Sequence, residues 1–111
     1  KYNYFKLAEE AYLRALELDP RYARALYGIG VLYAYELDEP AKAIPYLERL
    51  LEIEKLNTDG MFALARAYYT NYEFDKAVAM YDKIIATTQS PEKKLQAEEN
   101  KKTVLEAAYA R

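Results

Sequence analysis

The chain has 111 residues, of which 52% are hydrophobic and 31% are charged, so it can bury a core and stay soluble. Its 16 basic and 18 acidic residues leave a formal net charge of -2, which gives no signature of a nucleic-acid partner. There is no Cys and no His, so thiol chemistry and the commonest general base and metal ligand are excluded. We therefore expect no cofactor, no metal site and no enzyme activity.

The first half of the chain predicts three helices from the spacing of its apolar residues. The first covers residues 4–18 and ends at Asp19-Pro20, because the residue before a proline disfavours the helical conformation. The second covers residues 22–36. The third covers residues 41–56. Asp38 or Glu39 lies near its cap, and Pro40 lies in its first turn.

The second half predicts three more helices and no strand. The run Asn57-Thr58-Asp59-Gly60 supplies a cap and opens a helix over about residues 59–70, and a fifth helix covers residues 74–87. Ser90 at the cap and Pro91 at the first helical position open a sixth helix that reaches about residue 110. The turns of about three to four residues place sequential helices antiparallel, so the predicted fold class is all-α.

A repeated pattern runs through these helices. Ala8, Ala43 and Ala77 stand 35 (43 minus 8) and 34 (77 minus 43) residues apart, and each is followed four positions later by a large apolar residue: Tyr12, Leu47 and Tyr81. A fixed period in this range is typical of helical-hairpin arrays, whose units bury their apolar faces only by stacking. The chain also places one extra residue in its first interval, which we assign to the turn around residues 37–40.

These residues resemble the tetratricopeptide repeat. The first helix of that repeat carries a large apolar residue, then an apolar-small pair and a Tyr; here these are Leu26, Ile29-Gly30 and Tyr33, and then Met61, Leu64-Ala65 and Tyr68. The resemblance implies a right-handed superhelical stack of antiparallel helix hairpins, an α-solenoid of about six helices. The close approach within hairpins is expected between Gly30 and Ala43 and between Ala65 and Ala77, with the large residues filling gaps toward the next unit.

The resemblance also divides residues 1–111, a single domain, into units. Residues 1–22 correspond to the second helix of a truncated repeat, 23–57 and 58–91 to complete repeats, and 92–111 to a C-terminal capping helix. The start within a repeat suggests a fragment of a longer protein. The last helix keeps five apolar residues, and its polar run over residues 98–103 suits an outer face; the alternative is that it packs on further sequence. The apolar residues are Leu95, Val104, Leu105, Ala108 and Tyr109.

In tetratricopeptide repeats the first helices line a concave surface, which implies a partner-binding groove in this chain. Its predicted residues are Arg24, Tyr27, Val31, Tyr35, Asp59, Phe62, Arg66, Tyr69, Gln96 and Asn100, together with Ala34, Ala63, Thr70 and Lys93. Tyr and Arg are favoured at protein-binding hot spots. The four aromatic residues could equally be groove walls, and Arg66 could be solvated or paired with Asp59 or Glu73. The carboxylate clamp of some family members is absent, since Gly28 and Ala63 occupy its positions.

The sequence thus favours a non-catalytic protein-interaction module, a scaffold or adaptor that binds a peptide or helix of a partner. The alternative is an assembly segment that stacks or self-associates through its ends, near residues 2–5 and 105–109. The missing first helix is expected to leave the apolar face of Leu7, Ala11 and Leu16 partly uncovered, which favours self-association. No run of about 20 apolar residues is present, so no membrane insertion is expected. A soluble protein is expected, with the cytoplasm favoured and the bacterial periplasm as the alternative.

Overall fold

The computed structural model describes residues 2–110, with side chains from residue 3 onward. The helices in this range are α1 (Tyr2–Leu18), α2 (Ala23–Val31) with its π-helical continuation η1 (Leu32–Glu36), α3 (Pro40–Ile53), α4 (Thr58–Thr70), α5 (Phe74–Thr87) and α6 (Pro91–Tyr109). The described residues contain no strand. The prediction of an all-α chain with about six helices is confirmed.

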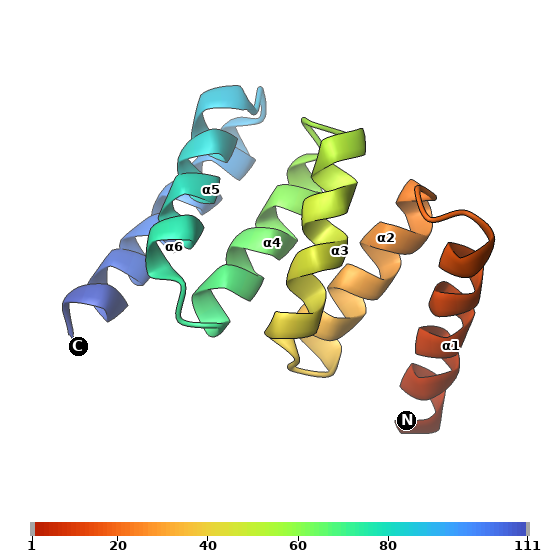
Figure 1. The fold of residues 1–111 in the computed structure, drawn as a ribbon. Helices are drawn as coiled ribbons and strands as arrows, with labels where there is room; N and C mark the ends of the chain where they lie inside the picture. The colour runs from red at the N-terminus through yellow and green to blue at the C-terminus, as the bar shows by residue number, and fades with distance from the viewer. Residues whose placement is uncertain (1, 111) are drawn as a thin grey trace.

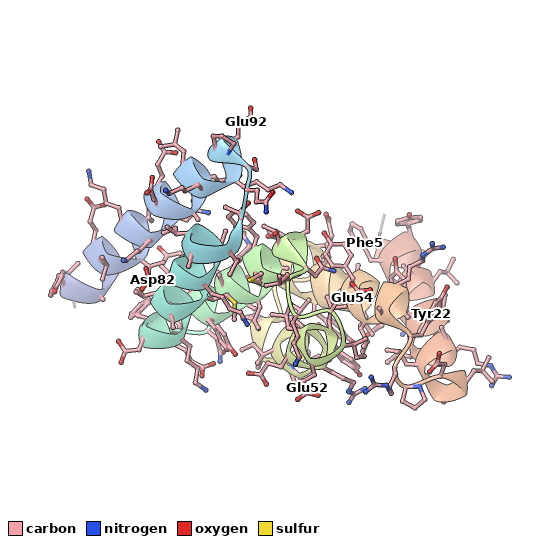
Figure 2. The ribbon with its side chains drawn as sticks, turned by 90° about the horizontal axis from the view of Figure 1, so that it is seen from above. Phe5, Tyr22, Glu52, Glu54, Asp82 and Glu92 are labelled. Carbon is pink, nitrogen blue, oxygen red and sulfur yellow. The ribbon has the colours of Figure 1, made fainter. Side chains whose placement is uncertain are left out.

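The helices stand in a row in which each packs on the next, with α1 at one end and α6 at the other (Figure 1). Sequential helices run antiparallel, and α2 also contacts α4, so the first helices of neighbouring hairpins lie side by side. The extents of the row are 39 × 30 × 21 Å. The view from above shows Tyr22 at the α1 end of the row and Asp82 and Glu92 at the α5–α6 end (Figure 2).

Local signals set where the helices begin. Asn57 caps α4, and its side chain accepts a hydrogen bond from the Gly60 backbone N–H at 2.9 Å. Ser90 caps α6 by accepting from the Lys93 backbone N–H at 3.2 Å, with Pro91 as the first helical residue. These two starts confirm the cap predictions. By contrast, α3 ends at Ile53, earlier than predicted, because Glu54 already leaves the helical conformation with φ -118° and ψ 82°.

Glycines allow the close approach of neighbouring helices. A Cβ on Gly30 would lie 2.3 Å from Leu47 Cδ2, and a Cβ on Gly28 would lie 2.4 Å from Tyr12 Cζ. Tyr12 therefore fills the gap between α1 and the next unit, as its position in the repeat predicts. A Cβ on Gly30 would meet Leu47 first, so Leu47 packs within its own hairpin. The expected close approach of Gly30 to Ala43 stays a prediction.

The extra residue of the first interval lies inside a helix, and its predicted place in the turn is wrong. The Leu37 backbone N–H donates to the Leu32 carbonyl at 2.9 Å, a bond that spans five residues and marks a π-turn. The turn that follows is the same in both repeats. Asp38 (φ 51°) corresponds to Tyr72 (φ 64°), and both stand one residue before the helix cap.

The outer ends of the row differ from the predictions in detail. On α1, Leu16 is buried in the core, whereas Leu7 is 65% exposed, so only part of the expected stripe is uncovered. On α6, the buried residues are Ala97 and Val104. Of the five apolar residues that the sequence assigns to this helix, only Val104 is buried. The small Ala97 is buried as well, whereas Leu95 is exposed to solvent.

Candidate functional site

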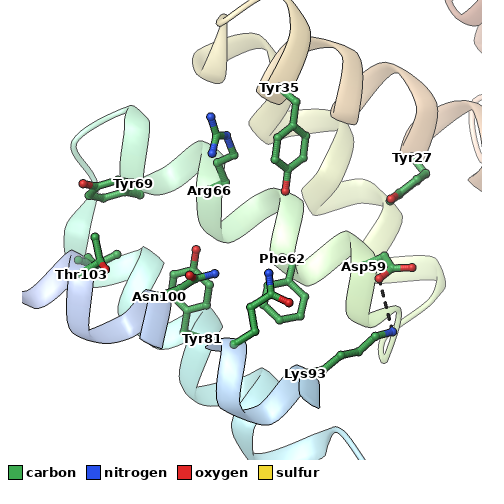
Figure 3. A pocket seen from close by; sticks show the side chains of 12 residues that line it. Tyr27, Tyr35, Asp59, Phe62, Arg66, Tyr69, Tyr81, Lys93, Asn100 and Thr103 are labelled. Atoms are coloured by element: carbon green, nitrogen blue, oxygen red, sulfur yellow. Dashed lines mark ion pairs between the residues drawn. The ribbon is translucent and has the colours of Figure 1, made fainter. Parts of the chain in front are cut away.

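A cavity of about 590 Å³ opens on the face formed by α2, η1, α4 and α6, with one residue from α5 (Figure 3). We call it the groove. It is lined by Tyr27, Tyr35, Asp59, Phe62, Arg66, Tyr69, Tyr81, Lys93, Gln96, Asn100, Thr103 and Val104. The hairpin geometry produces it, because the first helices of successive units lie on one side of the row and present the same faces.

The structure brings eight of the ten predicted site residues together around the groove: Tyr27, Tyr35, Asp59, Phe62, Arg66, Tyr69, Gln96 and Asn100. Lys93, expected from the same resemblance, also lines it. Arg24 is exposed and Val31 is half-buried against the core, and neither lines the groove. Ala34 and Ala63 are buried in the core, so their predicted place on the concave surface is wrong. That this set binds a partner stays a prediction.

Three lining residues were not expected from the sequence: Tyr81, Thr103 and Val104. Tyr81 is 4% exposed, as its expected packing role requires, and its ring centroid lies 6.3 Å from that of Phe62. It also reaches the groove floor from α5, beside Asn100 (Figure 3). The repeat position of Tyr81 predicts packing alone, so the sequence carried no signal for this second surface.

Arg66 stacks on an aromatic ring across the repeat boundary. Its guanidinium carbon lies 4.9 Å from the centroid of the Tyr35 ring (Figure 3). The alternative pairings of Arg66 are not formed. Glu73 binds Lys76 Nζ at 3.3 Å and the Asn71 side chain at 2.7 Å, and Asp59 turns toward α6.

Asp59 and Lys93 join the starts of α4 and α6 at the opposite end of the groove from Tyr69 (Figure 3). Their Oδ1 and Nζ atoms lie 3.6 Å apart, and the two side chains are 65% and 45% exposed. An exposed pair of this kind contributes little to stability, roughly 0–1 kcal/mol. Its main effect is to neutralise two of the three charges in the groove.

Burial raises the pKa of three tyrosine side chains in the groove. Burial, and then the Asp59 carboxylate, raise the pKa of Tyr27. Burial also raises the pKa of Tyr35, and the Arg66 guanidinium opposes that effect. Burial raises the pKa of Tyr81 to about 12. These hydroxyls are therefore hydrogen-bond donors at neutral pH.

The groove has the chemistry of a binding surface. Its side chains supply aromatic area, amide and hydroxyl groups, and a guanidinium.

Among residues 2–110, no cluster of carboxylates has the arrangement of a metal site. No helix in that range is both long and apolar enough to cross a bilayer.

A stack of antiparallel helix hairpins with a concave aromatic groove defines a helical-repeat protein. Two family models described as tetratricopeptide repeat match this chain, one over residues 34–98 and the other over residues 4–53. The chain belongs to the tetratricopeptide repeat family, whose members are generally non-catalytic protein-interaction modules. A search of curated proteins found no match to it.

Proposed function

We propose that this chain is a scaffold or adaptor module that holds a peptide or helical segment of another protein in the groove. The observation that carries the proposal is the convergence of side chains from three successive first helices on one cavity of about 590 Å³. Sites that bury a ligand are concave, mostly apolar and furnished with a few polar groups. The groove is concave and of mixed polarity, with aromatic rings along α2, η1 and α4 and charged, amide and hydroxyl side chains making up half of its lining residues.

Partner binding is expected to depend on the aromatic wall. The double variant Tyr27→Ala/Phe62→Ala removes two rings from the groove and should abolish capture of proteins that the wild-type chain retains from its native source. A matched control is Tyr22→Ala/Tyr109→Ala, which removes two exposed aromatic residues outside the groove. If a folded Tyr27→Ala/Phe62→Ala chain still captured the same proteins, the proposal that the groove binds the partner would be wrong.

A second variant covers the chance that removal of Phe62 unfolds the chain. Gln96 lines the groove and is exposed, so Gln96→Trp fills the cavity without removing a packed side chain. Circular dichroism should be unchanged while capture is lost. Full capture by a folded Gln96→Trp chain would count against the groove in the same way.

The second candidate is self-association through α1, and a stripe of exposed apolar residues favours it. Tyr4, Leu7 and Leu18 are 70%, 65% and 74% exposed and, with Ala11, follow a heptad-like spacing along one side of the helix. Leu7 corresponds to Lys42 in the next repeat. The Lys42 Nζ atom lies 5.6 Å from the centroid of the Tyr33 ring in the same hairpin. The polar Lys42, whose side chain is 56% exposed, thus takes the position of the apolar Leu7 in the next repeat. A two-fold contact between α1 helices would cover the apolar stripe in a second copy.

This second candidate predicts a dimer that depends on the stripe. Light scattering over a range of concentrations should give a rising mass for the wild-type chain. Leu7→Glu/Leu18→Glu should remain monomeric, whereas Glu10→Lys, a charge change elsewhere on α1, should not alter the mass curve. A wild-type chain that stays monomeric at every concentration contradicts it.

A further inference from the structure

The groove contains one cation without an acidic partner. Of its two cationic residues, Lys93 pairs with Asp59, while Arg66 lies within ion-pair distance of no carboxylate among residues 3–110. The Arg66 guanidinium carbon lies 4.9 Å from the centroid of the Tyr35 ring, within cation–π range. A guanidinium has five N–H donors, so this contact leaves donors for a second partner.

The charges of the groove are separated along its length. Asp59 and Lys93 stand at one end, beside Tyr27, and Arg66 stands toward the other end, near Tyr69 (Figure 3). The groove therefore carries one net positive charge on a chain whose formal charge is -2. The neutral polar groups around Arg66, such as the Tyr35 hydroxyl and the Asn100 amide, can each donate a hydrogen bond to an acidic ligand group.

We infer that Arg66 forms an acidic subsite: the partner segment that occupies the groove places an Asp or Glu side chain against the Arg66 guanidinium and an apolar side chain against Phe62. The inference rests on the proposed binding function and names the chemistry of the partner. A planar guanidinium that lies beside an aromatic ring and has no acidic partner among the described residues is suited to two parallel hydrogen bonds with a carboxylate. Phe62, half-buried beside Tyr81, supplies the neighbouring apolar surface.

The test uses a phage-displayed library of random linear peptides selected on the full 111-residue chain. Peptides that bind the wild-type chain should be enriched in Asp or Glu at one position, with an apolar residue close by. A selected peptide in which that acid is changed to its amide should bind at least about tenfold more weakly, as expected for loss of a hydrogen-bonded charge pair. Arg66→Gln should weaken binding of the acidic peptide by a similar factor and leave binding of the amide peptide unchanged.

The matched control is Arg49→Gln, because Arg49 also lies over a tyrosine ring, 5.8 Å from the centroid of Tyr46, but outside the groove. It should leave peptide affinity unchanged. Peptides that bind without acidic enrichment, tolerate Arg66→Gln and are lost in Gln96→Trp would overturn the acidic subsite and leave the proposed function intact. Failure to select any peptide whose binding is lost in Gln96→Trp would overturn both.

Discussion

The Tyr68 hydroxyl donates a hydrogen bond to Glu48 Oε2 at 2.5 Å, which links α4 to α3 across the boundary between two hairpins. The same acidic position one repeat later is Asp82 (48 plus 34), whose Oδ1 lies 2.6 Å from Lys101 Nζ on α6. A carboxylate after the large packing residue therefore binds the next first helix at the α3–α4 and α5–α6 boundaries. The donor changes from a phenol to an ammonium where the chain passes from repeat to terminal helix.

Removal of the phenol hydroxyl should weaken the stack without changing its packing. Tyr68→Phe keeps the ring, which is 6% exposed, and deletes the bond to Glu48. We expect a loss of about 1 kcal/mol in the free energy of unfolding, the usual net value of one hydrogen bond, since the freed carboxylate can be solvated. Urea unfolding measures it. Tyr22→Phe, on an exposed ring, serves as the control and should change nothing.

Gly30 should not tolerate a methyl group. A Cβ there would lie 2.3 Å from Leu47 Cδ2 and 2.5 Å from its Cγ, and Leu47 is fully buried. We expect Gly30→Ala to destabilise the chain by about 1–3 kcal/mol through overpacking, despite the better helix propensity of Ala. Thermal unfolding measures the change.

A double variant tests the cause of that loss. Leu47→Ala removes both the γ and the δ carbons that the new methyl group would meet, so Gly30→Ala/Leu47→Ala should lose less stability than the two single variants added together. Strict additivity would show that Gly30 and Leu47 do not act on each other, and the steric explanation would then be wrong.

Much of the fold could be predicted because the deciding signals are local. Asn57 at a cap, and Ser90 followed by Pro91, fix helix starts whatever the rest of the chain does. The repeat period then fixes which face of each first helix points to the groove, so eight of ten predicted residues lie around one cavity. Arg24 and Val31 lie elsewhere because periodicity assigns a face but does not say where along it the cavity begins and ends.

The rest depends on how helices meet across repeats. The π-turn in Leu32–Glu36 keeps helical apolar spacing, so a single inserted residue gives no sign of whether it enters the helix or the turn. The contact of Arg66 with Tyr35 depends on the distance between two helices and on the rotamers of both side chains. Neither follows from sequence spacing. Tyr81 was expected to pack, and it does, but its second surface toward the groove exists only because α6 stands opposite.

The cap of α4 should contribute measurably to stability. Asn57 Oδ1 accepts from the Gly60 N–H, and Asn57→Ala should cost about 1 kcal/mol of unfolding free energy because that donor loses its partner. Asn57→Ser retains an acceptor oxygen at the cap, places no second carboxylate beside Glu54, and should cost much less. Chemical denaturation distinguishes the two variants, and equal losses in both would contradict a capping role for the side chain.

High pH should destabilise the chain through its buried tyrosines. Burial raises the pKa of Tyr81 from 10.0 to about 12, and burial together with a bonded carboxylate raises the pKa of Tyr33 and Tyr68. An unfolded tyrosine loses its proton near pH 10, whereas the folded one retains it, so the folded state binds more protons above that pH. Stability from Tyr81 is therefore fully present below about pH 10 and falls as the pH rises toward 12.

Urea unfolding at a series of alkaline pH values tests this dependence, with Tyr81→Phe as the informative variant. Phe has no proton to lose, so the decline between pH 10 and 12 should be shallower in Tyr81→Phe than in the wild-type chain, whatever the variant costs at neutral pH. Tyr109→Phe, on a side chain that is 87% exposed, should decline as the wild-type chain does. Parallel curves for all three proteins would mean that Tyr81 ionises equally well in the folded and unfolded states, and that its burial between α4 and α6 does not protect its proton.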